Sequence, residues 1–444
     1  MFKREFIRDI LAKSRELEGL TIRVCGWVYR IRDLGGVRFI ILRDRTGVIQ
    51  SVFKRGDTPD HILKIAEDTR EEGILCVDGI LRRAPTREGY EILALDAKIL
   101  SNPIEPLPLE THDSLKASLP TRLKYRWLDA RNPKVSKIFQ LKSWVARKFR
   151  EYYSSQGFIE IFTPKIVASG TESGADVFSV LYFDRIAYLA QSPQFYKQFA
   201  VIAGFEKVYE VGPVFRAEPH HTTRHLNEYH SLDIEIGFIE SFHDVMDYVE
   251  GFFRKLAEDS RREEEIKGML EEFEVEPIEI PETGIPRIPI RRVYEILASE
   301  YGKKIPYGED LDPEGEKLIG NYVKEKYKSD LVFIIEYPWK IRPFYTMRKE
   351  DEPSWTYSFD LLLRGLEVVT GGQREHRYEK LKQNLKDKGL AEQDFQYYLD
   401  FFKYGVPPHG GAGMGLERIT MQILRLQNIR EARLLPRDTE RITP

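Results

Sequence analysis

The sequence predicts an α+β protein with a small β-barrel near its N-terminus and a larger antiparallel sheet flanked by helices after it. Three observations predict this class: short alternating strands fill residues 20–100, a proline-rich segment follows them, and the remaining chain mixes strands with helices. Runs of neighbouring strands interrupted by one charged helical stretch favour an antiparallel sheet over a doubly wound nucleotide-binding fold. We expect the domain boundaries at 1–103, 104–133 and 134–444.

Residues 1–103 are predicted to form a five-stranded barrel. A helical stretch at His61–Glu71 follows the third of five short strands, which are Thr21–Tyr29, Val37–Arg43, Val48–Phe53, Ile74–Leu81 and Tyr90–Leu95. Five strands with a helix in that place are the order of the OB-fold. Such barrels bind single-stranded nucleic acid on their strand face, through aromatic stacking and cationic contacts to phosphates.

The segment after the barrel is predicted to be a hinge, because Asn102-Pro103-Ile104-Glu105-Pro106-Leu107-Pro108 is extended and rich in proline. A helix at Val135–Gly157 and a strand at Phe158–Pro164 should follow. Later strands are expected at Arg185–Ala190, Lys207–Phe215, Ser231–Phe238, Leu331–Tyr337, Ser358–Val369 and Ala412–Gly415. Later helices are expected at Gln194–Ala203, Phe242–Met269, Arg377–Lys388, Glu392–Tyr404 and Leu416–Leu426.

Composition indicates a soluble cytoplasmic protein. The chain has 444 residues, of which 42% are hydrophobic and 31% charged, and no apolar run reaches the roughly 18 residues that span a bilayer. Only two cysteines occur, Cys25 and Cys76, both in apolar strand-like stretches. We expect them to be buried packing residues in a reducing compartment, with neither a zinc site nor a disulfide framework.

Charge is unevenly distributed along the chain. The net charge is −3, but residues 1–150 hold 30 Lys and Arg against 20 Asp and Glu. This basic part is where we expect a nucleic-acid backbone to bind. Solvated surface charge without a partner is the alternative reading of the same counts.

Three patches between Phe215 and Arg418 carry the residue types of a polyphosphate site. They are Phe215-Arg216-Ala217-Glu218, Gly371-Gly372-Gln373-Arg374-Glu375-His376-Arg377 and Gly410-Gly411-Ala412-Gly413-Met414-Gly415-Leu416-Glu417-Arg418. Guanidinium groups bind phosphate through two parallel hydrogen bonds, and glycines admit close approach of the backbone. Neither a P-loop nor a G-x-G-x-x-G motif after a first strand is present.

The order and spacing of these patches resemble motifs 2 and 3 of the class II aminoacyl-tRNA synthetases, and the middle patch resembles the aspartyl enzymes of archaeal type. The resemblance runs from Gly26-Trp27-Val28 through Gln191–Lys197 and Thr223–Glu228 to Leu435-Pro436-Arg437-Asp438. Helix 135–157 with its proline-terminated strand resembles motif 1, which forms a dimer interface in that family. The resemblance implies a class II catalytic domain, ATP, L-aspartate and tRNA(Asp) as substrates, Mg²⁺ as cofactor and a homodimer.

Carried over residue by residue, the resemblance places Arg216 and Arg418 at the catalytic centre, on the α- and γ-phosphates of ATP. The further ATP-binding positions are Glu218, Arg224, His225, Leu226 and Glu367. Glu367 and Thr370 match the magnesium positions, where the family commonly has serine in place of Thr370. Taken alone, the two arginines could be surface ion pairs, and Thr370 could be an ordinary strand residue.

The resemblance also implies an aspartate pocket and an anticodon surface. The pocket residues are Glu172, Gln194, Lys197, Arg216, Asp233, Thr370 and Arg374, and the anticodon residues are Tyr29, Arg32, Phe39 and Gln50. Phe39 could instead belong to the barrel core. Tyr29 matches neither the Trp nor the His that the family usually has there, so the sequence leaves open whether tRNA(Asn) is a second acceptor.

These residues predict an aspartate–tRNA ligase, which makes aspartyl-adenylate and transfers the aspartyl group to tRNA. Asparaginyl-tRNA synthetases are the first alternative, although they usually lack a lysine at the position of Lys197. An amide-forming asparagine synthetase is opposed by the complete barrel. A synthetase-like nucleic-acid-binding protein without catalysis is opposed by the intact phosphate and metal set, which is Arg216, Glu218, Glu367, Arg374 and Arg418.

Overall fold

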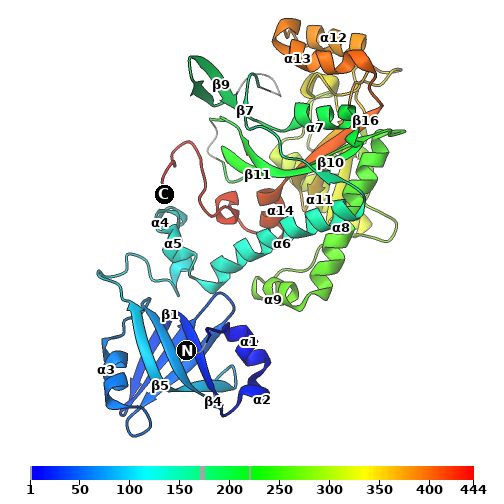
Figure 1. The fold of residues 1–444 in the computed structure, drawn as a ribbon. Helices are drawn as coiled ribbons and strands as arrows, with labels where there is room; N and C mark the ends of the chain where they lie inside the picture. Colours follow the sequence, from blue (N-terminus) through cyan, green and yellow to red (C-terminus); the bar gives the residue numbers. More distant parts are fainter. Residues whose placement is uncertain (1–2, 171–175, 220–221) are drawn as a thin grey trace. The chain divides into compact units, whose positions relative to one another are not determined.

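The computed structural model describes residues 3–170, 176–219 and 222–444. The chain divides into two compact units, Met1–Ser136 and Lys137–Pro444, each of which is described by itself (Figure 1). Residues 104–133 thus belong to the first unit. In the described ranges no helix is long and apolar enough to cross a membrane.

The first unit contains a closed five-stranded barrel in the order β1-β2-β3-β5-β4, which confirms the predicted OB-fold. Helix α3 (Asp60–Asp68) follows the third strand as predicted, and two short helices, α1 (Ile7–Ala12) and α2 (Ser14–Leu17), precede the barrel. The strands are β1 (Thr21–Leu34), β2 (Val37–Arg43), β3 (Val48–Lys54), β4 (Ile74–Arg83) and β5 (Tyr90–Ser101). Their inward positions form the core, for example Val24 and Val28 on β1 with Ile40 and Leu42 on β2.

Cys25 and Cys76 form a disulfide, so the expectation of two buried free thiols is wrong. The cysteines are directly opposite each other in the antiparallel β1–β4 ladder, with their Cα atoms 4.0 Å apart. Both side chains lie among the half-buried outward positions of their strands. The cysteines are separated by 51 positions, and only the strand register, which the sequence does not reveal, brings them together.

The segment after the barrel is bound to the rest of the first unit through the buried carboxylate of Glu72. The Glu72 carboxylate accepts hydrogen bonds from Arg43 and from Arg131, each at 3.1 Å. The Asn132 amide donates to the Thr111 carbonyl at 2.9 Å. Short helices also form here, namely η1 (Ser114–Lys116), α4 (Leu119–Lys124) and α5 (Arg126–Asp129). The extended conformation predicted from the proline-rich composition is therefore found in only part of this segment.

The second unit is built on an eight-stranded sheet in the order β12-β13-β14-β15-β16-β11-β10-β6. Its strands are β6 (Ile159–Glu160), β10 (Lys207–Phe215), β11 (Glu228–Gly237), β12 (Arg287–Pro289), β13 (Leu331–Ile335), β14 (Ser358–Leu363), β15 (Leu366–Gln373) and β16 (His409–Gly415). Only the outer pairs β6–β10 and β12–β13 are parallel, so the predicted antiparallel sheet is confirmed for the middle. A separate three-stranded sheet contains β7 (Ile166–Val167), β9 (Arg185–Leu189) and β8 (Ser179–Tyr182).

Several predicted elements are divided in the structure. The predicted helix at Glu392–Tyr404 consists of three short pieces, η4 (Glu392–Phe395), α13 (Gln396–Leu399) and η5 (Asp400–Tyr404). Residues 358–369 form a hairpin of β14 and β15, because Arg364 and Gly365 turn the chain with φ of 50° and 75°. A Cβ on Gly365 would also lie 2.8 Å from the Cα of Lys317, so this position requires glycine. The Arg364-Gly365 pair was therefore the signal in the sequence for this turn. Residues 242–269 form α8 (Phe242–Arg262) and α9 (Glu264–Glu272), which break at Glu263, a residue in extended conformation.

The other helices of the second unit fall mostly at predicted positions. They are α6 (Pro133–Ser155), α7 (Gln194–Ala200), α12 (Tyr378–Asp387) and α14 (Leu416–Ile423). The sequence reading missed α10 (Ile290–Tyr301) and α11 (Pro313–Tyr327), which cover β12 to β14. Both have apolar residues at helical spacing, packed around Val293, Leu297 and Ile319.

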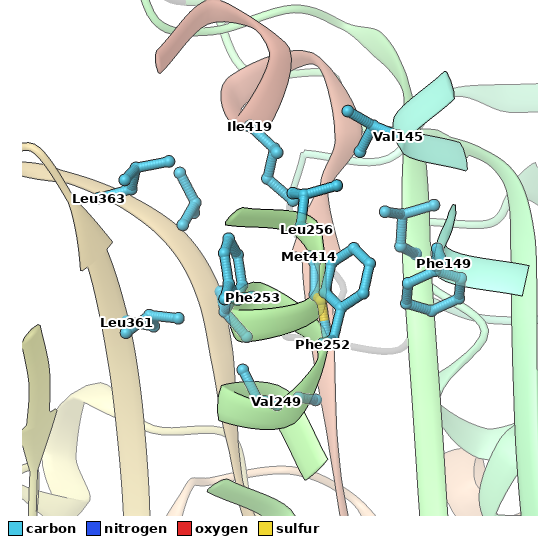
Figure 2. Close-up of a cluster of buried hydrophobic side chains, with 14 of the residues drawn as sticks. Val145, Phe149, Val249, Phe252, Phe253, Leu256, Leu361, Leu363, Met414 and Ile419 are labelled. Carbon is cyan, nitrogen blue, oxygen red and sulfur yellow. The ribbon is translucent and has the colours of Figure 1, made fainter. Parts of the chain in front are cut away.

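The main core lies between the sheet and helices α6 and α8 (Figure 2). Phe149 of α6 packs edge to face against Phe252 of α8, with ring centroids 5.4 Å apart. Along β11, Leu232, Ile234 and Ile236 belong to this core. Because side chains alternate along a strand, the intervening Asp233 and Glu235 are directed to the other face of the sheet.

A buried carboxylate, Glu417, joins α6, α14 and β11. Its Oε1 accepts from the Lys142 ammonium at 2.6 Å and from Arg433 at 3.1 Å, and its Oε2 accepts from the backbone N–H of His230 at 3.0 Å. Burial alone would raise the pKa of Glu417, but the hydrogen bond from the His230 ring, the Lys142 ammonium and the Arg433 guanidinium lower it to about 2. The ionised carboxylate therefore stabilises the folded state.

We predict that Glu417→Gln destabilises the protein at neutral pH and that this difference shrinks in acid. Because the pKa of Glu417 is lowered on folding, its contribution is fully present above its unfolded value of about 4.3 and is lost as pH falls toward 2. The expected loss near pH 7 is on the order of 3 kcal/mol. Urea unfolding of both proteins between pH 7 and pH 3 measures it, with the exposed Glu271→Gln as control. A difference that is independent of pH would contradict this account.

Candidate active site

A cavity of about 410 Å³ opens on the second unit, at the face of the sheet that carries Asp233 and Glu235. Strands β11, β15 and β16, helix α7 and the first turn of α14 supply much of its wall. It brings together the predicted catalytic, ATP, aspartate and metal residues of the described chain, which are Gln194, Lys197, Arg216, Glu218, Arg224, His225, Leu226, Asp233, Glu367, Thr370, Arg374 and Arg418. Glu172 lies outside the described residues.

Two buried cations stand at one end of the cavity, and each is paired with an acid of β11. The Lys197 ammonium is 2.9 Å from Asp233 Oδ1 and also donates to the Ala412 carbonyl at 3.2 Å. Arg374 donates from Nε and Nη2 to the two carboxylate oxygens of Glu235, at 3.0 and 3.3 Å. Its Nη1 group has no partner among the described residues, so two N–H donors remain available at the cavity wall.

Glu235 is a residue that the sequence reading missed. Its side chain is fully buried, which alone would raise its pKa, but Arg374 and Lys197 hold that pKa below the usual value. The alternation of Asp233 and Glu235 with Leu232, Ile234 and Ile236 in the second half of β11 was the available signal. Gly411 on β16 makes room for this carboxylate, because a Cβ there would lie 2.0 Å from Glu235 Oε2.

The arginines and the histidine predicted for the phosphates line the same cavity. Arg216 follows β10, is partly exposed and lies 3.8 Å from Glu218. Arg418, in the first turn of α14, donates to the Glu367 carbonyl at 3.0 Å. Arg224 forms a bidentate ion pair with Glu316 of α11, with distances of 2.9 and 3.3 Å. The His225 Nδ1 is 2.6 Å from the Thr222 hydroxyl. These three guanidinium groups thus reach the cavity, two from the connection between β10 and β11 and one from α14.

A β-bulge lies between the two predicted metal ligands on β15. Residues three apart in a regular strand point to opposite faces, which would separate Glu367 from Thr370. In the β14–β15 ladder, however, Leu362 pairs with Glu367 and Leu361 pairs with Val369, so Val368 is an extra residue. Val368 and Val369 both point into the core, and the side chains of Glu367 and Thr370 both reach the cavity wall.

Acidic neighbours surround the predicted metal position. Burial and the nearby Asp360 carboxylate raise the pKa of Glu367 to about 7, against the opposing effect of Arg418. Arg342, which the sequence reading missed, has its Nη2 2.8 Å from Asp360 Oδ2 and donates from Nη1 to the Thr370 hydroxyl at 3.0 Å. Asp360 itself was signalled by its place within the apolar run of β14. Carboxylate and hydroxyl oxygens are the donor types that Mg²⁺ prefers, so this set fits that ion.

The four residues predicted to read the anticodon lie on the barrel and not in the cavity. Arg32 and Phe39 are paired across β1 and β2, and Gln50 pairs with Ile41, which places all three on one outer face. Phe39 is half-buried and lies outside the barrel core, unlike its neighbour Ile40. Tyr29 lies at a bulge of β1, and the Arg43 guanidinium is 5.1 Å from its ring. The Gln50 amide donates to Glu91 at 2.8 Å.

Comparisons with known proteins assign both units. Residues 118–439 match the family of class II tRNA synthetases (D, K and N), and residues 22–100 match the OB-fold nucleic acid binding domain. The aspartate–tRNA(Asp/Asn) ligase of Aeropyrum pernix is 67% identical over the whole of both chains. The aspartate–tRNA(Asp) ligase of Pyrococcus furiosus is 45% identical, over 97% of this chain and 98% of its own.

Solved structures agree with this assignment. The asparaginyl-tRNA synthetase of Pyrococcus horikoshii, complexed with asparaginyl-adenylate, superposes with a TM-score of 0.92 at 30% identity, and all of both chains is covered. The aspartyl-tRNA synthetase of Entamoeba histolytica gives 0.88 at 30% identity, over 100% of this chain and 93% of its own. With the family match over most of its length, a cavity lined by cations and an OB-fold barrel, this chain belongs to the class II tRNA synthetases of the D, K and N group.

Proposed function

We propose that this chain is an aspartate–tRNA ligase, which joins L-aspartate to tRNA at the expense of ATP. The observation that carries the proposal is the pair of buried cations, Lys197 and Arg374, at one end of the cavity. A carboxylate side chain is the complement of two cations. The relatives named above, from Aeropyrum pernix and Pyrococcus furiosus, are both aspartate–tRNA ligases.

The first step requires positioning and charge neutralisation, and no nucleophilic side chain. An α-carboxylate oxygen of aspartate attacks the α-phosphorus of ATP, the bond to the bridging oxygen breaks, and pyrophosphate leaves with that electron pair. Arg216 would hold the α-phosphate and the attacking carboxylate, while Arg418 would hold the γ-phosphate. Arg216 directly follows β10 and Arg418 lies in the first turn of α14, so two separate parts of the fold position them, which supports such an arrangement.

Glu367 and Thr370 would hold Mg²⁺, with Asp360 nearby. When bound, the ion neutralises negative charge on the phosphates of ATP. Ionised Glu367 is the form that binds a cation, so metal binding and deprotonation of this residue should accompany each other. Before Mg²⁺ and ATP bind, the Arg342 guanidinium neutralises the negative charge of Asp360 beside this site.

The second step joins the aspartyl group to tRNA. A hydroxyl of the terminal ribose attacks the carbonyl carbon of aspartyl-adenylate, an ester forms, and AMP leaves. The outer face of the barrel, with Arg32, Phe39 and Gln50, would read the anticodon, since stacking of bases on an outward-facing aromatic is how such barrels bind single strands. We include tRNA(Asn) as a second acceptor, because the Aeropyrum pernix relative acts on both tRNAs at 67% identity.

An asparaginyl-tRNA synthetase is the alternative that the solved structures bring forward, because the Pyrococcus horikoshii enzyme shares the fold. The cavity argues against it. Neutral asparagine would leave the free donors of Arg374 without a charged acceptor, and unmet buried donors discriminate strongly between substrates.

We also propose that the chain forms an isologous homodimer through the region that resembles motif 1. Large apolar side chains are exposed on residues 159–166 and 178–186, including Phe162 at 84% and Phe183 at 82%. Ile159, Leu181 and Ile186 are at least half exposed as well. An exposed apolar surface of this kind marks an interaction site, and a two-fold pair buries the same surface on both subunits.

The first prediction on this function concerns the choice of amino acid. Aspartate should support ATP–pyrophosphate exchange at least about 10³-fold better than asparagine, because Lys197 and Arg374 require a carboxylate. Lys197→Leu should reduce the use of aspartate far more than the affinity for ATP. Lys207→Leu, on β10 outside the cavity, is a matched control. Comparable exchange with asparagine would refute the assignment.

The second prediction distinguishes the role of the barrel from that of the cavity. Phe39→Ala should weaken charging of tRNA(Asp) and tRNA(Asn) transcripts by about 1–3 kcal/mol in transition-state terms, and should leave pyrophosphate exchange nearly unchanged. Arg418→Ala should abolish both reactions, because the phosphate clamp is needed in the first step. Equal losses in exchange and charging for Phe39→Ala, with a lower melting temperature, would show that Phe39 only stabilises the barrel.

The third concerns assembly. Light scattering at micromolar concentration should give about twice the 52.0 kDa of one chain. Phe162→Asp should lower this mass toward one chain, because a charge at a buried apolar interface is poorly solvated. The exposed Phe238→Asp, on a separate segment, is the control. A wild-type mass of one chain would rule out the dimer.

A further inference from the structure

Behind the amino-acid end of the cavity lies a row of buried hydrogen-bonding side chains. Gln194 lines the cavity, and its Nε2 donates to Gln198 Oε1 at 3.0 Å. Gln198 Nε2 is 2.8 Å from His409 Nε2, and His409 Nδ1 is 2.9 Å from the Pro407 carbonyl. The Tyr398 hydroxyl donates to Gln198 Oε1 at 3.0 Å. Gln198, Tyr398 and His409 are fully buried.

The Pro407 carbonyl sets the direction of every hydrogen bond in this row. A carbonyl oxygen only accepts, so His409 Nδ1 must carry the hydrogen. Burial lowers the pKa of His409 to about 4, against the opposing effect of Glu235, so the ring is neutral at physiological pH. A neutral imidazole with its hydrogen on Nδ1 presents Nε2 as an acceptor. Gln198 Nε2 is therefore the donor to it.

The direction of these hydrogen bonds also fixes the orientation of the Gln194 amide. With its Nε2 bound to His409, Gln198 turns its Oε1 toward Tyr398 and Gln194. Gln194 must then offer its Nε2 to Gln198, which leaves its own Oε1 as the acceptor at the cavity. A rotated Gln194 amide would set two oxygens against each other and leave buried polar groups without a hydrogen bond, which is unfavourable.

We propose that His409 and Gln198 are positioning residues that lock the Gln194 amide with its carbonyl oxygen toward the α-ammonium group of the amino-acid substrate. The inference rests on the proposed function, in which Gln194 belongs to the aspartate pocket. An ammonium group only donates, so it requires this orientation of Gln194 and is repelled by the other. The orientation originates at Pro407, two residues from the start of β16.

The test uses succinate, which is aspartate without its ammonium group. In His409→Phe the acceptor for Gln198 is lost, and both amides are free to rotate. The KM for aspartate in ATP–pyrophosphate exchange should rise about tenfold, with the KM for ATP and the inhibition constant of succinate each within twofold of wild type. His409→Gln retains an acceptor oxygen for Gln198 and should keep the aspartate KM within about threefold. Phe402→Leu, whose ring centroid is 6.2 Å from that of His409, controls for packing and should change none of these constants.

Two results would overturn the proposal. One is an unchanged aspartate KM in His409→Phe, and the other is a parallel rise of the aspartate KM and the succinate constant, which would indicate general damage to the pocket. If His409→Phe does not fold, Gln198→Leu removes the same control over Gln194 and should give the same selective loss. Failure of wild type to use aspartate at all would instead refute the proposed function, so the two failures are distinguishable.

Discussion

The pairing of buried charges across β11 is the constraint on which the candidate active site depends. Lys197 and Arg374 are almost completely buried, and an unpaired charge in such a place would be neutralised or would unfold the protein. Asp233 and Glu235 supply the compensating charge from alternate positions of one strand. The cavity therefore holds two fixed cations before any substrate enters, and those cations need no rearrangement to receive a carboxylate.

The ion pairs of β11 and the two predicted metal ligands constrain the neighbouring strands. Strand β16 must pass so close to Glu235 that a side chain at Gly411 is excluded, which gives one glycine of the Gly-rich patch a structural reason within the protein itself. Strand β15 must present Glu367 and Thr370 on one face, which a regular strand cannot do, and the bulge at Val368 achieves it. The face opposite the cavity is filled by α6 and α8, whose aromatic side chains fix the positions of these strands.

Much of the fold could be predicted from the sequence, because alternation and turn residues are local signals. The barrel strands, β10, β13 and α14 all follow from such patterns. The charged motifs also identified most of the residues that line the cavity. Relationships set by register or by distant packing could not be predicted. The disulfide of Cys25 with Cys76 depends on the β1–β4 register, and the contact of Arg342 with Thr370 depends on a loop packed against β15.

The two ends of the amino-acid pocket are organised by different physical means. Lys197 and Arg374 carry full charges, so their polarity is fixed whatever surrounds them, and the protein only has to neutralise them. Gln194 is an amide whose two ends differ little in size, so its polarity has to be imposed by neighbours. A directed row of hydrogen bonds that begins at a backbone carbonyl imposes it without adding another charge beside Glu235. A neutral acceptor there leaves the balance of the two buried ion pairs undisturbed, which is why a histidine kept neutral by burial suits this position better than a charged side chain.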